Sequence, residues 1–122
     1  MYLGTDLKLI AAVRQVLTVR DYRLIACSDR GGAVMFLESE IPYDLLLIDL
    51  EWQGTEGLKM AQLARSLRHR KRMPTILVTP TKLSNKLKTL AREAGISKYV
   101  TKTSEGIVLS EAIRQLIYSP SV

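Results

Sequence analysis

The feature that most constrains the fold is an unbroken apolar run over residues 45–48 that ends in the carboxylate of Asp49. A short continuous apolar run between turn-forming segments is typical of a strand buried on both faces, as in a parallel sheet. In open α/β sheets, ligand chemistry gathers outside the carboxyl ends of the strands. A carboxylate at that position is costly to bury unless it is solvated, paired or functional. Asp49 therefore either caps the following loop or stands at the centre of a functional site.

Short apolar runs alternate with amphipathic stretches five times along the chain. The expected strands cover residues 1–3, 22–27, 45–49, 75–78 and 96–101. The expected helices cover residues 6–19, 30–38, 58–67, 82–94 and 109–118. This alternation predicts an α/β fold in which helices cover both faces of a parallel sheet.

Length and composition indicate one globular domain. The chain has 122 residues, of which 47% are apolar and 25% charged, which is ordinary for a globular protein. Residues 1–118 are expected to form the domain and residues 119–122 a tail or linker stub. No run approaches the roughly 20 apolar residues of a membrane span, and no signal segment is recognisable. The single cysteine, Cys27, cannot form an internal disulfide, so we expect a buried thiol and a cytoplasmic location.

The charge balance is basic, with 18 Lys and Arg against 12 Asp and Glu. The densest cluster spans residues 65–72. Such charge suits either solvated helix ends or an anionic partner such as nucleic acid. No DNA-reading motif or interleaved aromatic residue accompanies it, so nucleic acid is a distant alternative. No G-x-G-x-x-G loop or Ser–His–Asp set is present, so we do not expect an enzyme.

Several segments, taken in order, resemble the receiver domain of two-component response regulators, including the chemotaxis regulators. They are YDLLLID at 43–49, GTEG at 54–57, ILVT at 76–79, AG at 94–95 and KYVTK at 98–102. The resemblance covers essentially the whole chain. It implies the flavodoxin-like (βα)5 fold, a doubly wound parallel sheet of strand order 2-1-3-4-5.

The resemblance also implies roles for individual residues. Asp49 matches the phosphoacceptor, and Thr79 and Lys102 match residues that contact the phosphoryl group. Thr79 and Tyr99 match the pair that changes position on activation. A carboxylate can attack a phosphoryl group, and the transfer then depends on positioning and charge neutralisation. The plainer alternatives are a strand end for Thr79, a surface lysine for Lys102 and core packing for Tyr99.

The metal site departs from the family pattern. Receivers usually carry two adjacent acidic residues just after the first strand that hold Mg²⁺, and Gly4 and Thr5 stand at those positions. Mg²⁺ prefers oxygen ligands that include carboxylates. Asp49 stays a metal ligand by resemblance, Asp6 and Glu51 are weak substitutes, and Asp6 could instead cap the first helix. We therefore expect Mg²⁺ to bind weakly or not at all.

Two further departures concern the neighbouring loops. Pro80 lacks the backbone N–H that could donate to a phosphoryl group, and Thr103 stands where the family has proline.

Two functions stay open. One is a receiver that takes a phosphoryl group on Asp49 from a sensor histidine kinase or phosphotransfer protein. The other is a pseudo-receiver that works by phosphorylation-independent protein contact.

In receivers, the surface around the fourth helix and fifth strand commonly docks an effector protein or a second copy, so a homodimer is a further option. Here that surface is basic. We therefore expect an acidic partner, and the residues assigned to this surface are Lys82, Lys86, Lys98 and Tyr99.

Overall fold

The computed structural model describes residues 1–17, 24–50, 56–80, 82–101 and 106–117. The expected tail at 119–122 lies outside these residues, as do Glu51 and Lys102, to which the sequence assigned functional roles.

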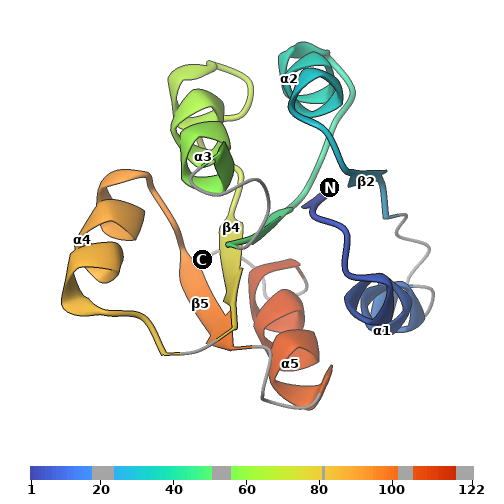
Figure 1. Ribbon diagram of the computed structural model, residues 1–122. Coiled ribbons are helices and arrows are strands. Elements are labelled where there is room, and N and C mark those ends of the chain that lie inside the picture. Colours follow the sequence, from blue (N-terminus) through green and yellow to red (C-terminus); the bar gives the residue numbers. More distant parts are fainter. Residues whose placement is uncertain (18–23, 51–55, 81, 102–105, 118–122) are drawn as a thin grey trace.

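Strands and helices alternate along the described chain, as the sequence predicted (Figure 1). The strands are β1 (Tyr2–Leu3), β2 (Ala26–Cys27), β3 (Leu46–Asp49), β4 (Thr75–Thr79) and β5 (Lys98–Thr101). The helices are α1 (Leu7–Leu17), α2 (Arg30–Glu38), α3 (Glu56–Ser66), α4 (Asn85–Glu93) and α5 (Gly106–Ile117).

The strands form one parallel sheet of order β2-β1-β3-β4-β5. This is the doubly wound, flavodoxin-like arrangement predicted from the sequence. Helices α1 and α5 cover one face of the sheet, and α2, α3 and α4 cover the other (Figure 1). In the part of the chain that the structure describes, no helix combines the length and the apolarity that crossing a bilayer requires.

The two faces of the sheet hold separate apolar clusters, because successive side chains of a strand point to opposite faces. In β1, Leu3 packs with the cluster under α2, α3 and α4. Its neighbour Tyr2 packs with the cluster under α1 and α5. Both side chains are fully buried. Cys27 is also buried, as predicted, and burial raises the pKa of its thiol.

Helix starts follow the capping side chains. Asp29 accepts a hydrogen bond from the Gly32 N–H at 2.6 Å, and α2 has the bounds that the sequence predicted. The predicted start of the fourth helix at Lys82 is wrong. The Ser84 hydroxyl accepts from the Leu87 N–H at 3.2 Å, so α4 begins at Asn85. Lys82 therefore lies before this helix and not on it.

Candidate functional site

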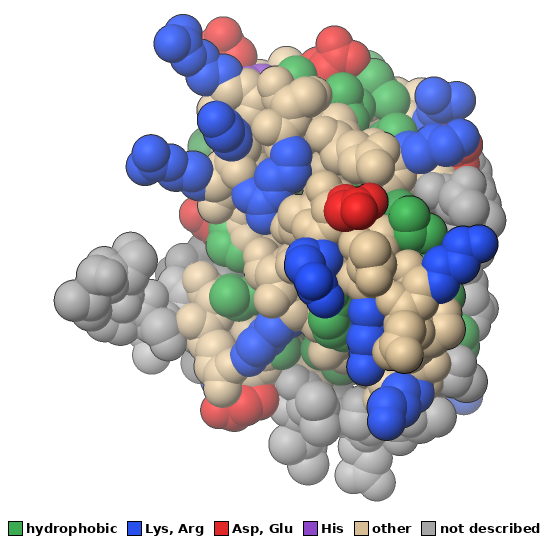
Figure 2. Space-filling view, turned by 90° about the vertical axis from the view of Figure 1, so that its left-hand side faces the viewer, with side chains coloured by type: hydrophobic (Ala, Val, Ile, Leu, Met, Phe, Trp, Pro, Cys, Tyr) green, Lys and Arg blue, Asp and Glu red, His purple; other side chains and the backbone are tan. Residues whose placement is uncertain are grey.

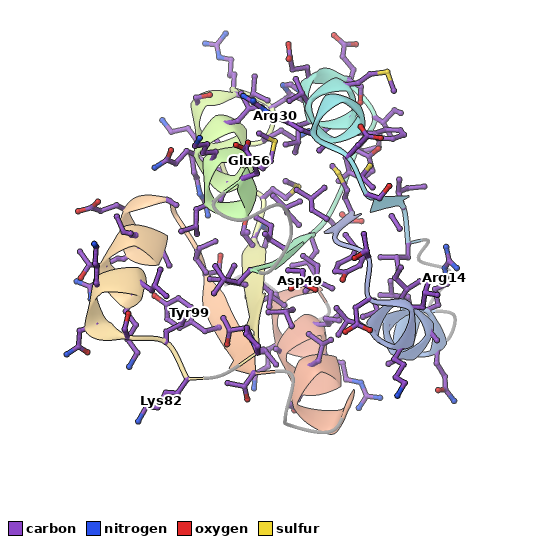
Figure 3. The ribbon with its side chains drawn as sticks, in the orientation of Figure 1. Arg14, Arg30, Asp49, Glu56, Lys82 and Tyr99 are labelled. Carbon is purple, nitrogen blue, oxygen red and sulfur yellow. The ribbon has the colours of Figure 1, made fainter. Side chains whose placement is uncertain are left out.

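Asp49 is the last residue of β3 and lies between the ends of β1 and β4. It pairs in register with Val78 of β4, and the next N–H, that of Leu50, donates to the Val78 carbonyl at 2.8 Å. The Asp49 side chain is only 3% exposed. Figure 3 shows it at the end of β3, where the carboxyl ends of the central strands meet. The sheet therefore holds a carboxylate at the edge where α/β proteins bind ligands.

The phenol of Tyr2 contacts this carboxylate directly. The Tyr2 hydroxyl donates to Asp49 Oδ2 at 3.1 Å and accepts from the backbone N–H of Asp6 at 3.3 Å. Burial, together with the nearby charge of Asp49, raises the pKa of Tyr2 well above its usual range. The hydroxyl therefore keeps its proton and acts as a neutral donor to Asp49. This role of Tyr2 could not be predicted from the sequence, because Tyr2 fits an ordinary buried strand position.

Gly4 makes room for that phenol. A Cβ atom added to Gly4 would overlap the Tyr2 hydroxyl oxygen and lie 2.9 Å from Asp49 Cβ. The backbone of residue 4 is therefore packed against both members of the Tyr2–Asp49 pair. A side chain at this position requires the phenol to move.

Asp6 is engaged in a helix cap. Its Oδ1 accepts from the N–H groups of Lys8 and Leu9 at 3.1 and 3.2 Å, so of the two roles left open by the sequence, the structure shows the cap. Within the described residues, no group of three or more acidic, histidine or cysteine side chains could hold a metal ion. The space beside Asp49 next to Gly4 contains a phenol instead of a second carboxylate. These donors do not fit the oxygen-rich, carboxylate-containing shell that Mg²⁺ prefers.

Thr79 ends β4, the strand next to Asp49, and is 1% exposed. It pairs in register with Thr101 of β5, the residue directly before Lys102. Tyr99 lies two positions earlier in β5 and is 40% exposed. Its hydroxyl donates to the Lys88 carbonyl of α4 at 3.5 Å. The plainer alternative of core packing for Tyr99 is therefore excluded, since this ring lies at the surface between β5 and α4 (Figure 3).

An ion pair borders the same edge of the sheet. Arg30 and Glu56 are the first residues of α2 and α3, and Arg30 Nε lies 3.4 Å from Glu56 Oε2. Lys59 also contacts the Glu56 carboxylate, at 3.3 Å. Figure 3 shows Arg30 and Glu56 on the same side of Asp49. This ion pair could not be predicted from the sequence, because the two residues belong to different helices.

The surface around α4 is basic, as expected. Figure 2 shows Lys and Arg side chains spread over this side of the molecule, with few acidic ones between them. Lys82 and Lys86 are exposed. Lys98 is half-buried, and its amine donates to the Gln115 side chain of α5. The predicted partner surface therefore has two solvated lysines and one that also links β5 to α5.

The densest basic cluster of the sequence, residues 65–72, is partly structural. Arg70 is buried and donates to carbonyl groups at the end of α2, while Arg65 donates to the carbonyls of Gly95 and Lys71. A hollow of about 600 Å³ lies beside this cluster, next to the residues that precede β3 and β4. It is therefore at the amino ends of the strands, opposite the edge that holds Asp49.

The fold, with a buried carboxylate at the end of the central strand, is that of a receiver domain. The family model of the response regulator receiver domain matches residues 5–114, so the chain belongs to this family. Receiver domains are components of two-component signalling, and the resemblance found in the sequence is thereby confirmed.

Individual relatives agree with this assignment. The chain is 27% identical over 100 residues to the signal transduction histidine-protein kinase BarA of Shigella flexneri, a match that covers 82% of the chain. The chain spans about a tenth of the length of this curated relative.

Solved structures share the fold. A CheY-like receiver domain protein from Methanospirillum hungatei JF-1 superposes with a TM-score of 0.79 and 23% identity, covering 96% of this chain and 90% of that one. The receiver domain of the sensor histidine kinase PA1611 from Pseudomonas aeruginosa PAO1 gives 0.76 and 23%, covering 97% and 96%. That structure has a magnesium ion coordinated in its active-site cleft.

Proposed function

We propose that this receiver accepts a phosphoryl group on Asp49 and thereby changes the surface around α4 and β5 that a partner protein reads. The observation that carries the proposal is the buried Asp49 carboxylate at the end of β3, next to the strand that ends in Thr79. The donor is a histidine kinase or phosphotransfer protein, and the reader is an effector protein or a second copy. The chain is thus a signalling component and not an enzyme with its own substrate.

The chemistry assigned to Asp49 is a direct phosphoryl transfer. One carboxylate oxygen forms a bond to phosphorus while the P–N bond of a phosphohistidine on the donor protein breaks. The departing ring nitrogen keeps the electron pair, and Asp49 becomes an acyl phosphate. Such a transfer depends on in-line positioning and on charge stabilisation rather than on proton abstraction from Asp49. The rigid end of β3 supplies the positioning.

The hydroxyl of Thr79 and the ammonium of Lys102 are assigned to the new phosphoryl oxygens. A hydroxyl can donate one hydrogen bond, and a lysine supplies a mobile positive charge. Mg²⁺ would add positive charge at the same place. Because the described donors do not fit a metal shell, we propose that it binds weakly, through Asp49.

Intact-mass measurement tests the acceptor. Incubation with acetyl phosphate and Mg²⁺ is expected to add one phosphoryl mass to the wild type and none to Asp49→Asn. Asp44→Asn is the matched control, because Asp44 is exposed and precedes the apolar run 45–48 that Asp49 follows. A mass gain that persists in Asp49→Asn contradicts the assignment.

A pseudo-receiver is the second candidate, and the Tyr2 hydroxyl on Asp49 favours it, because the acceptor oxygen already has a donor. Under this alternative, partner binding is the same for the wild type and for Asp49→Asn. Under the first proposal, phosphodonor treatment changes binding of the wild type alone.

A further inference from the structure

We propose that Tyr2 is a positioning residue that restrains Asp49, so that cations and phosphoryl donors compete with its hydroxyl for the acceptor oxygen. The inference rests on the proposed function of Asp49 as the acceptor. It concerns the contact between Tyr2, in β1, and Asp49, the last residue of β3.

The first support is the geometry of the hydroxyl. It donates to Asp49 Oδ2 at 3.1 Å while accepting from the Asp6 N–H at 3.3 Å. The Asp6 N–H occupies the acceptor side of the oxygen, so the phenolic proton is directed to Asp49. Hydrogen bonds to charged groups are stronger than those between neutral groups. One Asp49 oxygen is therefore held in a fixed position by a neutral donor.

The second support is the immobility of the ring. Tyr2 is fully buried and belongs to the apolar cluster beneath α1 and α5, together with Val13, Leu47 and Ile113. Movement of the hydroxyl away from Asp49 therefore requires the ring to shift within a packed core.

The third support is the absence of a side chain at Gly4. A Cβ there would overlap the Tyr2 hydroxyl oxygen, so Tyr2 and Gly4 are complementary. A side chain introduced at Gly4 would collide with the phenol and displace its hydroxyl from Asp49. The weak Mg²⁺ binding proposed above then has two causes, which are missing carboxylates and an occupied acceptor oxygen.

Tyr2→Phe isolates the hydroxyl, because phenylalanine keeps the ring that packs in the core. Loss of a hydrogen bond to a charged group changes a binding constant that competes with it by about tenfold. We therefore expect Tyr2→Phe to bind Mg²⁺ about tenfold more tightly than the wild type by isothermal titration calorimetry. We also expect its Asp49 to gain phosphoryl mass faster from acetyl phosphate. Tyr43→Phe is the matched control, because it removes another hydroxyl whose oxygen is buried, near the opposite edge of the sheet.

The two proposals fail separately. Equal Mg²⁺ affinity and equal phosphorylation rate in the wild type and Tyr2→Phe overturn the role of Tyr2, even if Asp49 is phosphorylated. Tighter Mg²⁺ binding without any mass gain supports the role of Tyr2 and removes the acceptor function. If Tyr2→Phe does not fold, Gly4→Ala displaces the hydroxyl without removing it and is expected to tighten Mg²⁺ binding in the same direction. Unchanged affinity in Gly4→Ala then overturns the proposal.

Discussion

The carbonyl oxygen of Gly95 accepts a hydrogen bond from Arg65 Nε at 3.2 Å, which links the second residue after α4 to the last turn of α3. Gly95 has a φ of 84°, in the left-handed region. A Cβ added there would overlap the Arg65 side chain and lie 2.8 Å from its Cγ. Both the backbone conformation and the packing therefore require glycine at this position.

Gly95→Ala is expected to lower the free energy of unfolding by at least about 1–2 kcal/mol, the usual cost of left-handed backbone in a residue with a Cβ. Urea denaturation measures this change. Gly31→Ala is the matched control, because a Cβ on this α2 residue lies no closer than 3.6 Å to Asp29 Oδ1. Within a helix, alanine is favoured over glycine by roughly 0.5–1 kcal/mol. A Gly95→Ala protein as stable as the wild type would contradict this account.

Arg70 is predicted to be structural although it belongs to a basic cluster. It donates to the carbonyls of Leu37 and Ser39 at 3.1 and 2.9 Å and lies 4.7 Å from the Tyr43 ring centroid. Arg70→Ala leaves carbonyls at the end of α2 without these donors, and we expect a loss of about 2–4 kcal/mol, since bonds from a charged group contribute roughly 1.5–3 kcal/mol.

The exposed Arg68 provides the comparison for Arg70 in thermal or urea unfolding. Arg68→Ala is expected to change stability by no more than about 0.5 kcal/mol, as is usual for surface substitutions. Equal effects of the two substitutions would show that Arg70 is an ordinary surface charge.

Tyr2 predicts a specific loss of stability at alkaline pH. The pKa of its hydroxyl is raised in the fold, from an ordinary value of 10.0, chiefly by burial. As the pH rises past 10.0, the unfolded chain therefore loses this proton first. The stabilising contribution is complete below that pH and falls by about 1.4 kcal/mol per pH unit above it. Urea unfolding of Tyr2→Phe between pH 9 and 11 should show a smaller decline than the wild type, and parallel curves would refute the prediction.

The order of strands and helices could be predicted well, because each element has its own pattern of apolar residues in the sequence. The alternation of apolar runs and amphipathic stretches predicted the order of strands and helices, and the predicted range 30–38 agrees with α2. The start of α4 was misplaced because Lys82 and Leu83 are compatible with a helix, whereas the hydroxyl of Ser84 sets the boundary. Helix boundaries depend on single capping contacts, which periodicity does not show.

In the candidate site, only the residues that end a strand could be placed from the sequence. Asp49 and Thr79 follow buried apolar runs, so their position at the edge of the sheet could be predicted. The contact of Tyr2 with Asp49 joins residues 47 positions apart. It depends on the register of β1 against β3 and on the room left at Gly4, which no local pattern encodes.

The last prediction concerns the coupling between Thr79 and Tyr99. Thr79→Val removes a hydroxyl while keeping the branched shape, so Asp49 should still gain phosphoryl mass in this variant. The new phosphoryl group then lacks one donor from β4, and the ring of Tyr99 on the adjacent strand β5 should no longer respond. Tyrosine-labelled NMR spectra, with Tyr99→Phe to assign the signal, measure that response before and after acetyl phosphate.

Thr75→Val is the matched control for this experiment. Thr75 is also buried in β4, but it lies at the opposite end of the strand, where its hydroxyl donates to the Met73 carbonyl at 3.4 Å. The Tyr99 signal is expected to shift on phosphorylation in the wild type and in Thr75→Val, and to stay unchanged in Thr79→Val and in Asp49→Asn. A shift of equal size in Thr79→Val would show that the phosphoryl group reaches the α4–β5 surface without Thr79. No shift in phosphorylated wild type would leave the constitutive, pseudo-receiver mode as the better description of this domain.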